Sequence, residues 1–245
     1  MSLFTGGFIH TYIIYNELVL PFSKKRMVVL EMKKLQGIYD DVISLGENCY
    51  TAIHLKKYRL RKYSGPLDWF ESPNLSSINT LLKNNFIDFM DLKNMHAMQE
   101  QNIVFNDGVI QPVFSHIIKD TKYNVTSYHD FPVVPNEDWF ITYHDFKQKL
   151  DRRIDNFYEK IHHSQSILFV RWGGNLTEAL ELQTVLSNIV KNNFKILLLY
   201  PTGLENEINE LEWGLDHVFP IQVSSNYQNK RTWYILLKDI HLNSK

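Results

Sequence analysis

Residues 41–49 read Asp-Val-Ile-Ser-Leu-Gly-Glu-Asn-Cys, a short apolar run that ends at a glycine and is followed closely by a cysteine. The run predicts a buried β-strand, and Gly46 predicts the turn that ends it. Apolar residues then recur at helical spacing over residues 49–60, which indicates a helix that begins at Cys49. The sequence therefore places a thiol at a strand-to-helix turn.

The C-terminal half continues the alternation of strand and helix. Nearly continuous apolar runs predict strands at residues 166–172, 196–200 and 217–223. Helices are expected at residues 145–162, capped by Asp145, at 177–191, capped by Thr177, and at 204–211. Apolar strands that alternate with helices are typical of parallel strands covered on both faces. The predicted fold is α/β, with a mixed, partly parallel sheet flanked by helices.

The middle of the chain has a different pattern. A loop over residues 61–73 leads to a helix that Ser76 or Ser77 could cap. Residues 103–110 predict a β-hairpin, because their Asn-Asp-Gly turn supplies the positive backbone angles of a tight turn. Residues 125–128 continue the extended character. We therefore expect a β-hairpin insertion in the α/β fold.

No Pro- or Ser-rich linker interrupts residues 41–240, so one α/β domain is expected over residues 36–245. Residues 1–35 are expected to be an N-terminal extension. Their apolar segment, residues 8–20, is broken by polar side chains and predicts neither a signal peptide nor a membrane helix. The expectation is a cytoplasmic protein without a membrane partner. Binding of residues 8–26 to a membrane surface is the alternative.

Composition excludes several classes of function. The 26 Lys and Arg residues nearly balance the 27 Asp and Glu residues, which argues against a nucleic-acid-binding protein with a dominant basic field. The chain has 1 cysteine, so it forms neither an internal disulfide nor a cysteine-based zinc site. The glycine pairs lack the residues of a phosphate-binding loop. No cofactor and no metal are therefore expected.

The position of Cys49 suggests nucleophilic chemistry. The backbone N–H groups and the dipole at a helix start favour a thiolate. Backbone groups near Gly46, together with the Asn48 side chain, are candidate donors to a developing oxyanion. The expected base is His129, at the end of a predicted strand, and His144 is the second choice. The alternative is a small, buried and unreactive cysteine.

Three motifs together resemble a known family. They are Ser-Leu-Gly-Glu-Asn-Cys at residues 44–49, Gly-Pro-Leu-Asp-Trp at 65–69 and Tyr-His-Asp-Phe at 128–131. The combination is similar to a bacterial family of unknown function described as papain-like cysteine peptidases, over about residues 35–200. The resemblance implies Cys49 as nucleophile and His129 as base, in the papain-like chain order. It also implies, as an alternative fold, an α+β papain-like arrangement.

The resemblance does not assign a third catalytic residue. Asp68 in the second motif and Asp130 beside His129 are candidates to orient the imidazole. Their alternative roles are to cap a turn and to bind the backbone, respectively. Arg171, at the end of a predicted strand, either grips a substrate carboxylate or pairs with an acidic neighbour. The basic residues between 56 and 62 form either a solvated face or a contact with an acidic or phosphate-bearing substrate.

The expected function is a cysteine-dependent hydrolase that cleaves an amide or ester through an acyl-enzyme. An acyltransferase with the same nucleophile is one alternative. A non-catalytic binding protein with a buried Cys49 is another.

Overall fold

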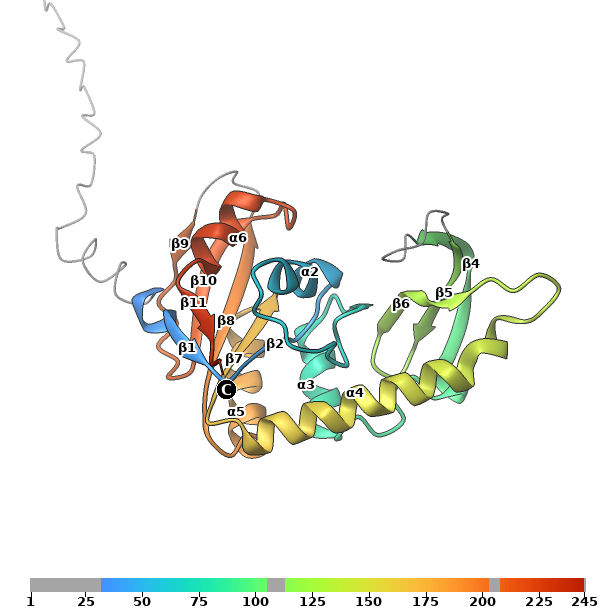
Figure 1. Cartoon of the computed structure of the whole chain (residues 1–245), viewed down its shortest axis with the longest axis horizontal. Helices are drawn as coiled ribbons and strands as arrows, with labels where there is room; N and C mark the ends of the chain where they lie inside the picture. The colour runs from blue at the N-terminus through green and yellow to red at the C-terminus, as the bar shows by residue number, and fades with distance from the viewer. Residues whose placement is uncertain (1–31, 105–112, 203–207, 245) are drawn as a thin grey trace, which may run out of the picture.

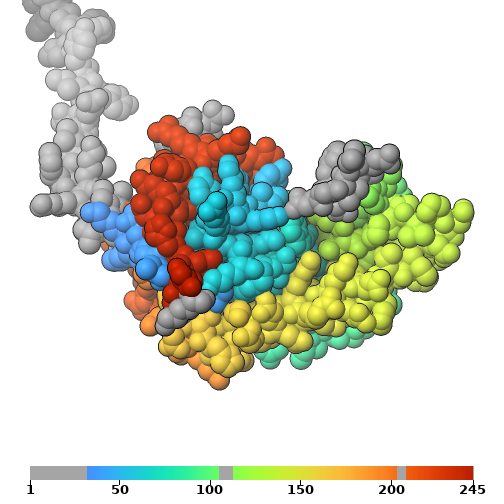
Figure 2. All heavy atoms as spheres, viewed as in Figure 1, coloured from blue at the N-terminus to red at the C-terminus, as the bar shows by residue number. Residues whose placement is uncertain are grey.

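The computed structural model describes residues 32–104, 113–202 and 208–244. Most of the expected N-terminal extension, the predicted hairpin turn and part of the predicted helix at 204–211 lie outside these ranges. Within them the chain forms two main sheets, which lie side by side above one long helix (Figures 1 and 2).

The first sheet is mixed and mainly parallel, which confirms the predicted fold class. Its strand order is β2-β7-β8-β10-β9. The first four strands run parallel to one another, and β9 pairs antiparallel with β10. The strands are β2 (Asp41–Ser44), β7 (Ser166–Trp172), β8 (Asn193–Thr202), β10 (Val218–Ser224) and β9 (Asn209–Glu210). The predicted strands at 166–172, 196–200 and 217–223 are all present in it.

Alternating side chains bury both faces of this sheet. Ile167 and Phe169 belong to one apolar cluster, together with residues of α3, α4 and α5. Leu168 and Val170 belong to a second cluster, together with residues of α2 and α6. The helices are α2 (Cys49–Lys57), α3 (Leu75–Lys83), α4 (Tyr143–His163), α5 (Leu176–Ile189) and α6 (Lys230–Leu237). Because both faces are covered, the strands read as continuous apolar runs in the sequence.

The second sheet is antiparallel and larger than the predicted hairpin. Its order is β3-β6-β5-β4. The strands are β3 (Phe70–Glu71), β4 (Met95–Val104), β5 (Val113–Asp120) and β6 (Val125–Pro132). Ile103 and Val104, which begin the predicted hairpin, lie in β4 and pair with Phe114 and Val113 of β5, whereas the predicted turn and returning strand lie outside the described residues. A further pair of short parallel strands, β1 (Gly37–Tyr39) and β11 (Ile240–Leu242), was not predicted.

Helix α4 joins the two sheets from below (Figure 1). Near its N-terminus Phe146 packs on Phe131 of β6, with ring centroids 4.5 Å apart. Farther along, Phe157 packs on Phe86, which follows α3, at 5.7 Å. These rings belong to the same apolar cluster as Phe169 of the parallel sheet. This shared core supports the proposal that the chain from residue 36 onward folds as one domain.

Several predicted local features were wrong. Ser76 and Ser77 lie inside α3, which follows Asn74, and Asp145 is the third residue of α4. Residues 209–210 form strand β9 instead of a helix. Helix α5 begins at Leu176, and its N-cap is Asn175 instead of Thr177. The Asn175 side chain accepts a hydrogen bond from the Glu178 backbone, and the Glu178 carboxylate accepts one from the Asn175 backbone. This reciprocal pair satisfies two backbone donors that Thr177 does not reach.

We predict that Asn175→Ala lowers the free energy of unfolding by about 1 kcal/mol, because the backbone N–H of Glu178 loses its acceptor. The control is Thr177→Ala, two residues away, which should change it by less than about 0.5 kcal/mol. Urea unfolding followed by circular dichroism measures both values. A larger effect at Thr177 than at Asn175 would contradict the observed cap.

Candidate active site

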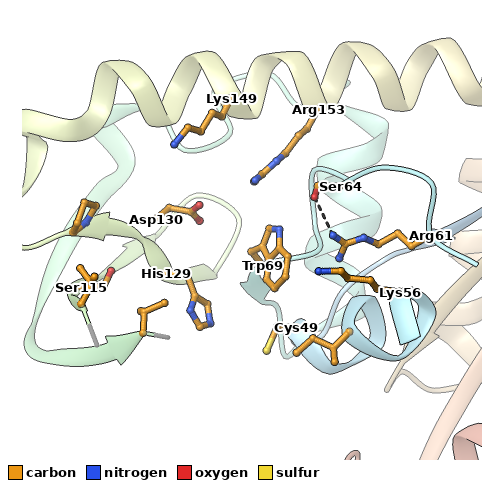
Figure 3. Close-up of a pocket in the computed structure, with 14 residues that line it drawn as sticks. Cys49, Lys56, Arg61, Ser64, Trp69, Ser115, His129, Asp130, Lys149 and Arg153 are labelled. Atoms are coloured by element: carbon orange, nitrogen blue, oxygen red, sulfur yellow. Dashed lines mark hydrogen bonds between the residues drawn. The ribbon is translucent and has the colours of Figure 1, made fainter. Parts of the chain in front are cut away.

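A cavity of about 760 Å³ lies between the helix that begins at Cys49 and the antiparallel sheet (Figure 3). Cys49 and Ile53 of α2 lie on one wall, and His129 and Asp130 of β6 lie on another. The other lining residues are Lys56, Arg61, Ser64, Trp69, Val104, Val113, Ser115, Pro132, Lys149 and Arg153. The cavity therefore brings together three of the predicted site residues: Cys49, His129 and Asp130.

Cys49 is the first residue of α2 and lies beyond the carboxyl end of β2. Gly46 and Glu47 in the preceding turn have φ values of 81° and 80°. A side chain at position 46 would approach the Ser72 hydroxyl to 3.0 Å and the Leu67 carbonyl to 3.2 Å, so this position needs glycine. Glycine at this position therefore allows the turn to pack closely against the segment around Ser72.

Arg171 of β7 holds that segment and the turn together. Its guanidinium is fully buried, and it donates to the Leu45 carbonyl at 3.0 Å, to the Ser72 hydroxyl at 2.9 Å and to the Ser72 carbonyl at 2.6 Å. Ser72 in turn accepts from the Glu47 backbone N–H at 3.0 Å and donates its own N–H to the Glu47 carbonyl at 2.8 Å. Burial lowers the pKa of Arg171 to about 10, and the Glu47 charge opposes that shift.

Arg171 is therefore a structural residue. It does not line the cavity, which argues against the predicted grip on a substrate carboxylate. The sequence also suggested an acidic neighbour, and Glu47 fits that alternative through its charge. The sequence did not show that the guanidinium would turn inward to backbone carbonyls.

His129 lies in an irregular part of β6. Ser127 pairs with Ile118 of β5 and Phe131 pairs with His116, so three residues of β6 lie opposite one residue of β5. This bulge interrupts the alternation of side chains between the two faces of the sheet. Because of it, the consecutive residues His129 and Asp130 both line the cavity.

The His129 imidazole and the Cys49 side chain lie on neighbouring walls below Trp69 (Figure 3). The Trp69 and His129 rings pack edge to face. Their centroids are 6.3 Å apart, and the angle between the ring planes is 71°. Burial lowers the pKa of His129 below its ordinary value, and the charge of Asp130 opposes this shift. At neutral pH the imidazole is therefore uncharged and able to accept a proton.

The thiol of Cys49 is also uncharged. Burial raises its pKa, its own backbone N–H lowers it, and the Glu47 carboxylate raises it further. The backbone N–H at the helix start favours the thiolate, as expected, but burial has the larger effect on the pKa. A neutral thiol is a weak nucleophile unless a base removes its proton, and His129 lies in the same cavity.

The two aspartates have different surroundings. Asp68 is buried outside the cavity lining, where it accepts from the Gly65 backbone at 2.9 Å and lies 3.4 Å from Arg61. Burial raises its pKa to about 6. It caps a turn and holds Arg61, as the alternative interpretation of its motif suggested. Asp130 lines the cavity and accepts from the Ser127 hydroxyl at 2.8 Å.

The predicted oxyanion donors are largely occupied. The Gly46 N–H donates to the Ser44 hydroxyl at 3.2 Å. The Asn48 side chain caps α2 by accepting from the Tyr50 N–H at 2.9 Å, and its amide donates to Glu47. Neither residue lines the cavity. The backbone N–H of Cys49 lies close to its own sulfur, where it favours the thiolate.

Three further points concern the second candidate base, metal binding and membrane-spanning helices. His144, the second candidate base, lies outside the cavity lining and contacts Gln148 on α4. Across the described residues, no group of three or more His, Cys, Asp or Glu side chains could hold a metal ion. Among the helices of the described ranges, none has the length and apolar character to span a membrane.

Sequence reasoning did not identify several cavity residues, among them Ser115, Lys149 and Arg153. Lys149 and Arg153 are four residues apart on a strongly predicted helix, so they share one face of it. The spacing alone predicts that the two side chains share one face of the helix. It does not predict that this face borders a cavity.

We predict that Arg171→Met lowers the free energy of unfolding by about 3 kcal/mol, since it leaves buried carbonyls without donors. The matched control is Arg231→Met, which removes an exposed arginine of α6. Urea titration of both variants tests this difference. A loss below about 1 kcal/mol at position 171 would contradict the structural role.

We also predict that Glu47→Gln increases the rate at which iodoacetamide alkylates Cys49 at pH 8. Removing the carboxylate lowers the pKa of the thiol, so more thiolate is present and the rate rises by about threefold. Peptide mass spectrometry of timed samples gives the rate, with the exposed Glu137→Gln as control. An unchanged or slower reaction would contradict the conclusion that the Glu47 carboxylate raises the pKa of the thiol.

Comparison with known proteins identifies a family. A family model described as "Putative papain-like cysteine peptidase (DUF1796)" matches residues 40–202. An uncharacterized protein of Acanthamoeba polyphaga mimivirus is 31% identical over 134 residues, which are 53% of this chain and 60% of the viral protein. The match thus spans less than two thirds of that relative. No solved structure matches the chain significantly. The family match runs from the start of β2 to the end of β8 and includes Cys49 and His129, and the chain belongs to this family.

Proposed function

We propose that the chain is a cysteine-dependent hydrolase of the peptidase or amidase type, with Cys49 as nucleophile and His129 as base. One observation carries the proposal: the single cysteine and a neutral histidine from distant parts of the chain line the same cavity. Membership of a family described as papain-like cysteine peptidases supports the same chemistry.

The proposed reaction has two steps. His129 accepts the proton of the Cys49 thiol while the sulfur attacks the carbonyl carbon of an amide or ester. The resulting imidazolium donates this proton to the departing amine or alcohol, which leaves a thioester on Cys49. Water then attacks the thioester as His129 takes its proton, and the thiol recovers a proton as the carboxylic acid is released.

Two neighbouring groups assist in this proposal. The Cys49 backbone N–H donates to the oxyanion of the tetrahedral intermediate. The Asp130 carboxylate, next to His129, stabilises the imidazolium that forms during attack, since its charge already favours protonation of the ring. Asp130 is therefore the proposed third catalytic residue. Asp68 has a different role, which is to hold Arg61 in position.

Two alternatives are distinguished by their chemistry. An acyltransferase would form the same thioester and pass the acyl group to an acceptor other than water. A non-catalytic binding protein is favoured by the raised pKa of Cys49, which makes the resting thiol a weak nucleophile.

A small activated ester tests the acyl-enzyme. With p-nitrophenyl acetate at pH 7, mass spectrometry should find an acetyl group on Cys49, and its later loss in water alone indicates hydrolysis. His129→Gln should slow acylation by about 100-fold, because the base is lost. His144→Gln, outside the cavity, should leave the rate unchanged. Equal rates in wild type and His129→Gln would contradict the proposed pair.

The pH dependence of acylation gives a separate prediction. His129 must be unprotonated to act, and its lowered pKa keeps it so below pH 6.5, the ordinary value. The rate should therefore hold its plateau at pH 6.5 and fall only at lower pH. A profile that instead rises through pH 8 to 9 in both wild type and His129→Gln would indicate simple thiol ionisation.

A further inference from the structure

The wall of the cavity next to α4 is basic. Lys149 and Arg153 lie four residues apart on α4, and both side chains extend from the helix toward the cavity (Figure 3). Arg61 lies across from them, after α2. We call these three residues the basic wall. Lys56 also lines the cavity.

Arg61 is held in a defined position. Its guanidinium lies 3.4 Å from Asp68, donates to the Ser64 hydroxyl at 3.1 Å and lies over the Trp69 ring at 5.2 Å. A side chain that is already ordered loses little entropy when it binds a ligand. The buried Asp68 carboxylate offsets the charge of Arg61, so Arg61 adds little net positive charge to the cavity. Its contribution is a set of hydrogen-bond donors in a fixed orientation.

Lys149 and Arg153 are less closely paired than Arg61, although the charge of Arg153 also acts on the buried Asp68. Across the described residues, neither side chain has a carboxylate within 4 Å. The next arginine, Arg152, is exposed and does not line the cavity. Asp130 is the one carboxylate among the cavity-lining residues, and it accepts a hydrogen bond from Ser127. Two cations thus project into the space that substrate must occupy.

Cations in a concave site attract an anion more strongly than the same charges on an open surface, because low-dielectric walls focus the field. The fork of a guanidinium matches two oxygens of a carboxylate or phosphate, and an ammonium adds a point charge. The Cys49 side of the cavity carries the reacting groups, and the α4 side carries the basic wall.

We propose that the basic wall binds an anionic oxygen group of the substrate, a carboxylate or a phosphate, so that the bond cleaved at Cys49 belongs to an acidic molecule. This inference rests on the proposed function for the identity of the bond that is cleaved. The anion site itself does not depend on the reactivity of Cys49. The substrate class is therefore an amide or ester with a negative charge near the scissile carbonyl.

The first experiment measures binding without any reaction at Cys49. Isothermal titration calorimetry at low ionic strength compares inorganic phosphate with acetate, in the wild type and in the double variant Lys149→Gln/Arg153→Gln. We expect at least one anion to bind the wild type with a Kd about tenfold lower than the double variant. The anion with the larger ratio identifies the phosphate or carboxylate source.

Arg152→Gln is the matched control, because it removes the same charge from the neighbouring position of α4. It should keep the wild-type Kd, and circular dichroism should show that all variants are folded. If neither anion distinguishes the wild type from the double variant, the proposal is wrong, whatever Cys49 does.

The second experiment places the anion site relative to the thiol. Iodoacetate and iodoacetamide alkylate thiols by the same displacement of iodide, but iodoacetate carries a carboxylate. The ratio of their rates at Cys49 cancels the intrinsic reactivity of the thiol. We expect this ratio to fall by about tenfold in the double variant and to fall in the wild type as salt is added.

The two proposals fail in different ways. A Cys49 that iodoacetamide does not alkylate in the folded protein would overturn the proposed function, while the calorimetric result for the anion site would stand. The link between the basic wall and the reacting bond would be overturned by a different result. In that result, iodoacetamide alkylates Cys49 at a normal rate, and the ratio of the iodoacetate rate to the iodoacetamide rate is equal in the wild type and the double variant.

Discussion

The guanidinium of Arg171 is the contact on which the candidate site depends. It bonds to the carbonyl that follows β2 and to Ser72, which follows β3. Strand β2 leads to Cys49, and β3 pairs with β6, the strand of His129. One buried charge therefore connects the two sheets that carry the proposed nucleophile and base. A buried guanidinium is costly unless its donors are used, so this contact favours a single relative position of the two halves.

This arrangement explains why the cavity lies where it does. The parallel sheet ends at a tight turn that needs glycine at position 46, and the antiparallel sheet contributes a bulge that brings His129 and Asp130 to one wall. Helix α4 borders the space on a third side and supplies Lys149 and Arg153. The thiol and the imidazole are both neutral at rest, so the proposed chemistry relies on proton transfer between them during attack instead of a preformed ion pair.

Much of the fold could be predicted from the sequence, because doubly covered strands such as β7 and β8 are continuous apolar runs. The helix start at Cys49 was also predictable, from the glycine turn and the apolar spacing that follow β2. The antiparallel sheet was underestimated, since most residues of β4 are exposed and carry no apolar pattern.

The details of the site were harder to predict for physical reasons. A bulge such as that around His129 depends on pairing with a partner strand, which local sequence does not show. Arg171 follows an apolar run, and nothing in that run indicates that its donors meet carbonyls 99 and 126 residues away in the chain. Asn48 was expected to face substrate, but as the residue before a helix it is used as the cap.

The proposed chemistry requires that Cys49 and His129 lie within reach of each other in the folded protein. Dibromoacetone, a short reagent with two alkylating carbons, tests it directly, since it can join a thiol to a nearby imidazole. We expect mass spectrometry to find one product in which the peptides containing Cys49 and His129 are linked. A link from Cys49 to another histidine, or attachment at Cys49 alone, would contradict it.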